Sequence, residues 1–374
     1  MEYRISEFAQ DLMEDVRNYS LREIRMRAAR IDRQQQPSGE ILEKIRELGL
    51  TGIFLPAVEE EIPLTMQEQA ALLGELGSHD AGSAVSAAVA DLAFQPVKIA
   101  GTQEQKDFCG GILEAGGFGA FCLTEDNAGS DISTVKTRAV RVPGGYVLNG
   151  SKTMITNSVS AEFLTVFAVL DGKLAAFLVP GEAEGIQKGE PEQKLGIRTS
   201  ETGSLWFNDV QLSEKALIGA PDQGRELADR ALNIGRMHCA AIAIGLAERA
   251  LEETISRIRE RTGFDKPLSD NPVIRTKLAE MYLRKEAAKG VLIHALENVD
   301  SAGGEDPAML ASAAKCLASD AAVECTMEAV QLFGGYGYCQ DYPVEKLMRD
   351  AKAFQIIEGA NEIQKMIIGR KLVK

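Results

Sequence analysis

Residues 163–179 read Phe-Leu-Thr-Val-Phe-Ala-Val-Leu-Asp-Gly-Lys-Leu-Ala-Ala-Phe-Leu-Val, two apolar runs separated by Asp171-Gly172. An Asp-Gly pair in this setting is a strong signal for a β-hairpin with a two-residue turn. Gly144-Gly145 separates another pair of short apolar runs, and residues 204–212 extend the β pattern. We therefore predict a small antiparallel β domain over residues 116–221.

Helical patterns fill residues 1–115, ahead of the β domain. Thr-x-x-Glu at residues 65–68 and Thr-x-x-Gln at residues 102–105 are capping-box sequences, and each precedes a segment with apolar periodicity. Gly49 and Gly77 stand where helices would stop, because glycine readily adopts the left-handed conformation that ends many helices. These signals predict an N-terminal helical domain.

Long helices are expected in residues 222–374, after the β domain. Residues 227–261 carry a nearly uninterrupted helical pattern, and Pro272 and Pro307 each follow an Asn or Asp, as at the start of a helix. We therefore predict an α+β protein that is mostly α. Its parts are an N-terminal helical domain, a central antiparallel β domain and a C-terminal helical bundle.

The composition narrows the class of partner. The 374-residue chain has a net charge of −14, which argues against nucleic acid, because phosphate binding needs clusters of Lys and Arg. No apolar run approaches the ~18 residues that span a bilayer. The N-terminal residues also lack the basic and apolar regions of a signal peptide. We expect a cytoplasmic protein with no membrane segment.

Cysteine and histidine are scattered along the chain. The six cysteines form no Cys-x-x-Cys pair and the three histidines are isolated, so we expect reduced, mostly buried thiols and no metal site. No Gly-x-Gly-x-x-Gly sequence follows a predicted strand, so the Rossmann fingerprint is missing. The glycine-rich residues 334–337 follow a predicted helix and by themselves indicate a helix end and a turn.

One carboxylate stands out near the C-terminus. Residues 356–364 read Ile-Ile-Glu-Gly-Ala-Asn-Glu-Ile-Gln and place Glu358 between two apolar residues and a glycine. Desolvation would raise the pKa of this carboxyl group and make it a better base. Most glutamates are solvated, so Glu358 becomes a candidate base only through the motifs that accompany it.

Six motifs occur in a fixed order along the chain. They are Phe-Cys-Leu-Thr-Glu (121–125) with Ala-Gly-Ser-Asp (128–131), Asn-Gly-Ser-Lys (149–152) with Ile-Thr-Asn (155–157), Arg-Thr-Gly-Phe (261–264), Gln-x-Phe-Gly-Gly-Tyr-Gly (331–337), Arg-Asp-Ala (349–351) and Glu-Gly (358–359). With these motifs the chain resembles the acyl-CoA dehydrogenase family over essentially its whole length. The family's fold, a β domain between two helical domains, matches the predicted order.

The resemblance implies FAD bound without a Rossmann fold. It places Leu123, Thr124 and Ser130 at the flavin and pyrophosphate, where hydroxyl and backbone N–H groups suit an anion. Thr156 would bond near flavin N5. Met154 occupies a position that is often aromatic and packs on the flavin ring, and a polarizable thioether can make this contact.

A second set of matching residues resembles those that reach the FAD of a neighbouring subunit. Arg261 would pair with pyrophosphate, since guanidinium suits phosphate geometry, although a solvated helix arginine is the other interpretation. The remaining members of this set are Phe264, Gln331, Gly334 and Gly335. An FAD shared between subunits implies an oligomer, which we expect to be a homotetramer built from dimers.

Glu358 matches the family's base, which removes the α-proton of an acyl-CoA while hydride passes from the β-carbon to flavin N5. The resemblance implies electron transfer onward to electron-transferring flavoprotein, and substrate contacts at Ser130, Ile357 and Gly359. Some branches of the family carry the base on the long helix, immediately before an arginine. The matching residue is Gly235, so no competing base stands there.

Asp91 interrupts an apolar helical stretch, residues 87–92. The matching family segment lines the far end of the acyl cavity. Asp91 is either a paired or helix-surface aspartate, or a second polar or basic group that acts on a cyclic, unsaturated or ω-functionalised acyl chain. We therefore count Asp91 among the candidate catalytic and substrate-binding residues.

Three other functions are compatible with the same motifs. The scaffold could run as an enoyl-CoA reductase, or as an oxidase that uses oxygen, although acyl-CoA oxidases are typically longer. A non-catalytic helical scaffold is the third, against which Glu358 and the flavin motifs argue. Neither the acyl group nor the direction of the reaction is encoded in these motifs.

Overall fold

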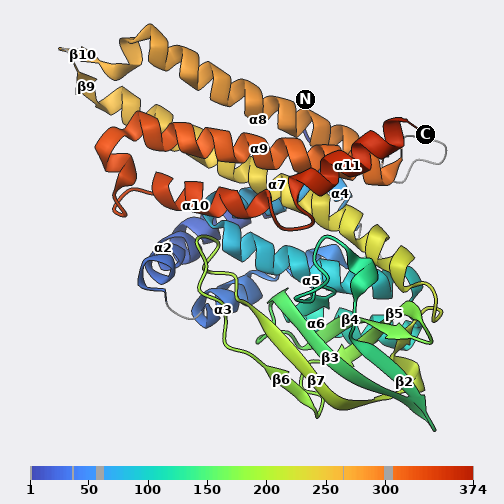
Figure 1. Ribbon diagram of the computed structural model, residues 1–374. Helices are drawn as coiled ribbons and strands as arrows, with labels where there is room; N and C mark the ends of the chain where they lie inside the picture. The colour runs from blue at the N-terminus through green and yellow to red at the C-terminus, as the bar shows by residue number, and fades with distance from the viewer. Residues whose placement is uncertain (1, 36–37, 56–62, 264, 299–305, 374) are drawn as a thin grey trace.

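The computed structural model describes residues 2–35, 38–55, 63–263, 265–298 and 306–373. Helices come first in the chain, a β-sheet follows, and long helices complete it (Figure 1). The predicted fold class, helical domain, β domain and helical bundle, is confirmed. We retain the division near residues 115 and 221 as a proposal.

The N-terminal helices begin where the sequence indicates. They are α1 (Glu7–Tyr19), α2 (Arg25–Gln34), α3 (Gly39–Leu48), α4 (Met66–His79), α5 (Ala81–Ala100) and α6 (Gln103–Glu114). Both predicted capping boxes are formed, at Thr65 for α4 and at Thr102 for α6. Gly49 ends α3 in the left-handed conformation, with φ +69°.

The expectation that Gly77 ends a helix is wrong. Gly77 lies inside α4, two residues before its end. A Cβ atom at Gly77 would come within 2.9 Å of Ile242 Cγ2 in the long helix α7 (Gly224–Glu260). This glycine therefore permits close packing of two helices. In the sequence alone, such a glycine looks the same as one that ends a helix.

The predicted hairpins are present in one sheet. Its strands are β1 (Gly119–Cys122), β2 (Arg138–Val142), β3 (Gly145–Thr156), β4 (Phe163–Leu170), β5 (Lys173–Pro180), β6 (Ile186–Lys188), β7 (Thr202–Ser213) and β8 (Leu217–Ile218). Asp171 and Gly172 form the β4–β5 turn with φ values of +51° and +79°. The β2–β3 turn is Pro143-Gly144, one residue earlier than the sequence suggested.

The sheet is mixed, which corrects the expectation of a purely antiparallel domain. Strand β4 pairs in parallel with β1 over residues 119–122 and with β2 at Arg138, whereas its pairing with β5 is antiparallel. Neither β1 nor β2 is joined to β4 by a hairpin, so chain connectivity does not impose an antiparallel pairing. Hairpin signals therefore identify pairs of neighbouring strands but not the complete sheet.

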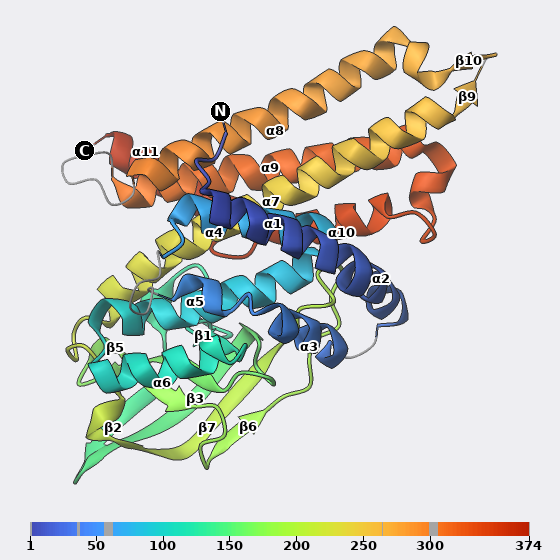
Figure 2. The same cartoon turned by 180° about the vertical axis from the view of Figure 1, so that it is seen from behind.

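The C-terminal helices form a bundle along one side of the molecule (Figures 1 and 2). They are α7 (Gly224–Glu260), α8 (Pro272–Asn298), α9 (Pro307–Phe333), α10 (Val344–Phe354) and α11 (Asn361–Leu372), with the short strands β9 (Thr262–Gly263) and β10 (Lys266–Pro267) after α7. The predicted starts at Pro272 and Pro307 are confirmed, and Asp306 caps α9.

Helix α7 connects the two helical parts, because it packs against α4 and α5 as well as α8 and α9. Helix α5 also packs on β1 and β4, so its side chains are buried over almost its whole length. Five of the six cysteines are buried, as predicted, and Cys339 is exposed. In the described ranges, no helix is both long and apolar enough to cross a membrane.

Candidate active site

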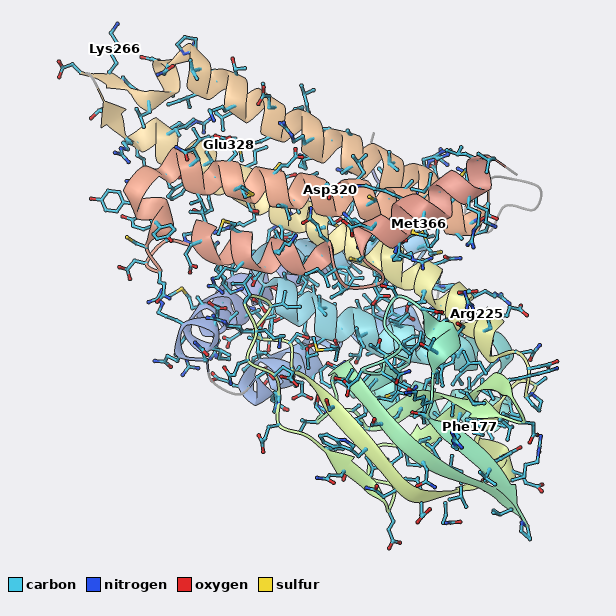
Figure 3. All side chains as sticks on the ribbon, viewed as in Figure 1. Phe177, Arg225, Lys266, Asp320, Glu328 and Met366 are labelled. Carbon is cyan, nitrogen blue, oxygen red and sulfur yellow. The ribbon has the colours of Figure 1, made fainter. Side chains whose placement is uncertain are left out.

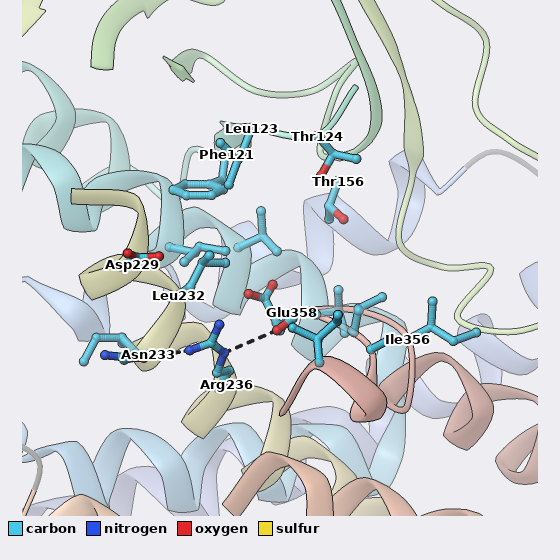
Figure 4. Close-up of a pocket in the computed structure, with 18 of the residues that line it drawn as sticks. Phe121, Leu123, Thr124, Thr156, Asp229, Leu232, Asn233, Arg236, Ile356 and Glu358 are labelled. Atoms are coloured by element: carbon cyan, nitrogen blue, oxygen red, sulfur yellow. Dashed lines mark hydrogen bonds between the residues drawn. The ribbon is translucent and has the colours of Figure 1, made fainter. Parts of the chain in front are cut away.

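A cavity of about 2450 Å³ lies where the three parts of the chain meet. Ligand pockets commonly measure about 300–1,000 Å³, so this cavity has room for a large cofactor and a substrate together. Helices α5 and α7, strands β1 and β3, the loop between β6 and β7, and the turn between α10 and α11 all contribute to its wall. Figure 4 shows its centre.

Glu358 occupies the turn between α10 and α11 and lines this cavity. Its backbone is left-handed, with φ +55°, and the next residue, Gly359, has φ +90°. Such backbone conformations are strained for a non-glycine residue and persist only where the surroundings hold them. Figure 4 shows the Glu358 side chain between Arg236 on α7 and two threonines, Thr124 just after β1 and Thr156 at the end of β3.

Three side chains hold the turn through its carbonyl groups. Arg236 Nε donates to the Glu358 carbonyl at 3.4 Å, and Gln364 Nε2 donates to the carbonyls of Glu358 and Gly359 at 3.1 and 2.9 Å. Lys315 Nζ donates to the Gly359 carbonyl at 2.9 Å. The backbone of the candidate base is therefore fixed without use of its carboxylate.

The Glu358 carboxylate is partly desolvated, on a residue of intermediate exposure. Its Oε2 atom is buried and has no hydrogen-bond partner among the described residues. Burial raises the pKa of Glu358 to about 7, an increase that the positive charges of Arg236 and Lys315 partly offset. A carboxylate with a pKa near the working pH is suited to general base catalysis.

Gly235 makes room for this carboxylate. A Cβ atom at Gly235 would lie 2.7 Å from Glu358 Oε2. At the position that other branches of the resembled family use for their base, this chain has a glycine, and the side chain of Glu358 lies against it. The sequence showed the absence of a competing base there, and the structure adds that any side chain would displace the carboxylate.

The residues expected at the flavin all line the same cavity, namely Leu123, Thr124, Ser130, Met154 and Thr156. The hydroxyl groups of both threonines and the serine have no hydrogen-bond partner in the part of the chain that the structure describes. A register shift in the β3–β7 pairing lies between Lys152 and Ile155 and includes Met154, a residue that is 56% exposed. Bulges of this kind often adjoin active sites.

A buried ion pair supports the flavin-side strand. Lys152 is fully buried, and its Nζ donates to Glu125 Oε1 at 2.8 Å and to the Leu123 carbonyl at 3.0 Å. Glu125 also accepts the backbone N–H groups of Lys136 and Thr137. No local sequence signal indicated these supporting roles, because they depend on contacts between β3 and the loop after β1.

The residues expected to reach a neighbouring subunit lie away from the cavity. Arg261 Nη1 donates to the Phe333 carbonyl at 3.2 Å, which brings Arg261 beside Gly334. Gln331, Gly334 and Gly335 are exposed at this end of the bundle. Figure 3 shows Lys266, just beyond Arg261 in the chain, at the opposite end of the molecule from Arg225 in the cavity wall. Phe264 is outside the described residues.

Asp91 lies behind the cavity wall. It is fully buried in α5 and does not line the cavity, which favours the interpretation as a paired aspartate over a direct place in the acyl pocket. Gln95, one turn further along α5, does line the cavity and donates Nε2 to both Asp91 oxygens at 2.9 Å. Burial raises the pKa of Asp91 to about 6, against the effects of Gln95 and Lys98.

The first turns of α7 supply polar cavity residues, three of which, Arg225, Asp229 and Asn233, belong to no motif noted in the sequence. Arg225, Asp229, Asn233 and Arg236 all line the cavity, and Arg236 Nη1 donates to Asn233 Oδ1 at 2.8 Å (Figure 4). Residues three or four apart share one face of a helix. The spacing of these polar residues was therefore a usable signal for a polar stripe at the cavity wall.

Comparison with known proteins identifies the class. Three family models match in succession: acyl-CoA dehydrogenase, N-terminal domain, over residues 6–109; middle domain, over residues 120–210; and C-terminal domain, over residues 222–373. An acyl-CoA dehydrogenase of Bacillus subtilis (strain 168) is 36% identical over 367 residues, covering 96% of each chain.

Solved structures agree with this match. Butyryl-CoA dehydrogenase from Megasphaera elsdenii has a TM-score of 0.94 and 34% identity, with 100% of each chain covered. A glutaryl-CoA dehydrogenase from Mycobacterium smegmatis in complex with FADH2 has a TM-score of 0.91 and 27% identity, covering 98% of this chain and 95% of that one.

The family matches and the solved relatives show that this three-part fold with its large cavity is that of an oxidoreductase. The chain belongs to the acyl-CoA dehydrogenase family, whose members are FAD-dependent enzymes.

Proposed function

We propose that this protein is an FAD-dependent dehydrogenase that converts an acyl-CoA to its α,β-enoyl-CoA. The observation that carries the proposal is Glu358: a carboxylate without a partner for Oε2, held by its backbone in the wall of a large cavity. Because burial raises the pKa of Glu358 to about 7, a substantial fraction of the enzyme holds an ionised base near neutral pH.

The residues around the cavity fit FAD. The unpartnered hydroxyls of Thr124, Ser130 and Thr156 can donate to a flavin and its phosphates, while Leu123 and Met154 offer apolar and polarizable contacts to a flat ring. When bound, FAD accepts the hydride that leaves the substrate β-carbon. We also propose that Arg261, Phe264, Gln331, Gly334 and Gly335 contact the FAD of another subunit in a homotetramer.

Glu358 is proposed to take the α-proton of the bound thioester. The α-proton is weakly acidic, so the negative charge that develops on the thioester oxygen needs hydrogen-bond donors. The backbone N–H groups of Glu358 and Gly359 have no acceptor among the described residues and are available for this role. Proton acceptor and oxyanion donor thus belong to the same rigid turn.

Other cavity residues are proposed to bind and orient the substrate. Ile357 and Gly359 would contact the acyl thioester, and Ser130 the chain of CoA. Arg225 and Arg230, at the start of α7, can bind the phosphates of CoA. We propose that the electrons leave to electron-transferring flavoprotein and that the enzyme works in the cytoplasm.

The decisive experiment is anaerobic flavin bleaching. We expect the purified protein to be yellow, to contain FAD and to lose its flavin absorbance when mixed with a saturated acyl-CoA of suitable chain length. An enoyl-CoA should not bleach it, and this serves as the matched control. A colourless protein that cannot take up FAD would overturn the proposal, and reoxidation of reduced enzyme only by enoyl-CoA would favour the reductase direction.

The pH dependence of kcat/KM tests the role of Glu358. The base must be ionised, and its pKa is raised to about 7, so kcat/KM should increase with pH through about 7 and then level off. The relevant measurement is the initial rate with a saturated acyl-CoA between about pH 5.5 and 9. A rate that decreases over this range would contradict a carboxylate base.

A further inference from the structure

The proposed reaction does not use a polar pair at the inner wall of the cavity, formed by Gln95 in the wall and Asp91 behind it. Asp91 is fully buried in an apolar part of α5, and its hydrogen-bond donor among the described residues is the amide of Gln95, with Nε2 at 2.9 Å from both carboxylate oxygens. The nearby His238 is also buried, with its Nδ1 at 3.7 Å from Asp91 Oδ2. Burial lowers the pKa of His238 to about 3, so this ring is neutral near pH 7.

The carboxylate fixes the orientation of the glutamine amide. An ionised carboxylate accepts hydrogen bonds and donates none, so a flipped amide would place Gln95 Oε1 against two negative oxygens. The orientation with Nε2 towards Asp91 is therefore the stable one. Gln95 Oε1 is left without a partner among the described residues, on a side chain that is only 8% exposed and lines the cavity.

Gln95 lies a short distance from the candidate reaction centre. Leu92 Cδ1 lies 3.1 Å from the position that a Cβ of Gly235 would occupy, which itself adjoins Glu358. Gln95 follows Leu92 by three residues, a shift of ~4.5 Å along the helix axis. An acyl chain that reacts beside Glu358 therefore reaches Gln95 a few bonds beyond its β-carbon.

The charges around Gln95 determine which kind of substituent on an acyl chain can bind beside it. The carboxylate of Asp91 disfavours an anionic substituent, and Lys98, which also lines the cavity, disfavours a cationic one. The neighbouring cavity residues Val89, Leu92 and Ile99 are apolar and suit a carbon chain. A neutral hydrogen-bond donor is the group that complements a lone carbonyl oxygen in this setting.

We propose that Gln95 is a specificity-determining residue, positioned by Asp91, and that the preferred substrate is an acyl-CoA with a hydroxyl group a few carbons beyond the β-carbon. This inference rests on the proposed dehydrogenase function. Asp91 then acts through Gln95 and does not itself touch the substrate. A net hydrogen bond of about 1 kcal/mol corresponds to a preference of roughly 5-fold, and more if the unfilled site leaves Gln95 Oε1 desolvated.

The test compares hexanoyl-CoA, 5-hydroxyhexanoyl-CoA, 6-hydroxyhexanoyl-CoA and the two corresponding methyl ethers, by kcat/KM at about pH 8. The ethers keep the oxygen but lack the donor. We expect one hydroxy substrate to exceed both its ether and hexanoyl-CoA by roughly 5-fold or more. Equal values for hydroxy substrates and ethers would overturn the inference. If hexanoyl-CoA is turned over in that case, the proposed dehydrogenase function still stands.

Two variants separate positioning from a structural role. In Asp91→Asn, the asparagine side chain at position 91 can donate a hydrogen bond as well as accept one, so the Gln95 amide can adopt either orientation. The preference for hydroxyl over ether should then disappear, while hexanoyl-CoA is still oxidised. The double variant Asp91→Leu with Gln95→Leu removes both buried polar partners and should give the same loss of preference. A hydroxyl preference that survives in both variants would overturn the assignment of Gln95.

Discussion

Glu358→Gln is expected to retain FAD and to lose turnover by about 10²–10⁴-fold or more. Glutamine preserves the size of the side chain, but it cannot accept the α-proton. The turn itself should survive, because Arg236, Lys315 and Gln364 hold its carbonyl groups and not its carboxylate. The measurement is the rate of anaerobic flavin reduction by acyl-CoA in a single turnover, with FAD content determined from the visible spectrum.

Glu362→Gln provides a matched control for that experiment. Glu362 lies four residues further along the chain, in the first turn of α11, and its side chain is exposed. We expect this variant to reduce its flavin at the wild-type rate. Near-normal turnover in Glu358→Gln would refute the assignment of the base and direct attention to Asp91, a fully buried carboxylate behind the cavity wall.

Lys346→Met is expected to lower the free energy of unfolding by about 3–5 kcal/mol, because it leaves buried charges without a partner. Lys346 Nζ lies 2.8 Å from Asp80 Oδ1 and 2.6 Å from Asp350 Oδ2, and both aspartate side chains are fully buried. Asp350 also accepts the N–H of Ile197, and Asp80 the hydroxyl of Thr199. The lysine therefore joins α5, α10 and the loop that precedes β7.

Denaturant unfolding at several pH values measures this effect. In the wild type, burial alone would lower the pKa of Lys346, but Asp350 and Asp80 hold it above its usual value. In the variant the two aspartates lose that cation, so their pKa values in the folded state should increase. Folding then favours protonated carboxyls, and the loss of stability should grow as pH increases from about 5 to 8.

Lys215→Met is the control for Lys346→Met. Lys215 pairs with Glu104, and both side chains are largely exposed. Ion pairs of this kind contribute about 0–1 kcal/mol, so the unfolding midpoint should scarcely change. A similar small change for Lys346→Met would show that the buried cluster does not hold the three segments together.

Local signals in the sequence predicted much of the fold. The Asp171-Gly172 turn, the caps at Thr65 and Thr102 and the helix starts at Pro272 and Pro307 all occur where expected. Each depends on residues within one turn of the chain, so the sequence alone contains the necessary information. Gly77 was misinterpreted because a glycine that packs against another helix looks the same as one that ends a helix.

In the candidate site, too, local sequence predicted some features and the fold decided others. The motifs named the residues that line the cavity, and Leu123, Thr124, Ser130, Met154, Thr156 and Glu358 do come together there. Asp91 was a candidate for the acyl pocket, but α5 turns the next residue, Leu92, into the cavity wall and leaves Asp91 fully buried. Adjacent residues of a helix point about 100° apart around the axis. Matching a motif to a segment does not distinguish which of two adjacent residues faces the cavity.

The sequence by itself determined the family, the order of the three parts and the identity of the candidate base, because these depend on local patterns and motif order. Tertiary structure decided whether Glu358 is suited to be a base. Burial raises its pKa to about 7, and the positive charges of Arg236 and Lys315, which distant segments supply, partly offset this increase. Likewise, only the fold buries the Asp91–Gln95 pair and places Gln95 in the cavity wall. Desolvation and orientation are properties of a packed environment, and no short stretch of sequence contains that environment.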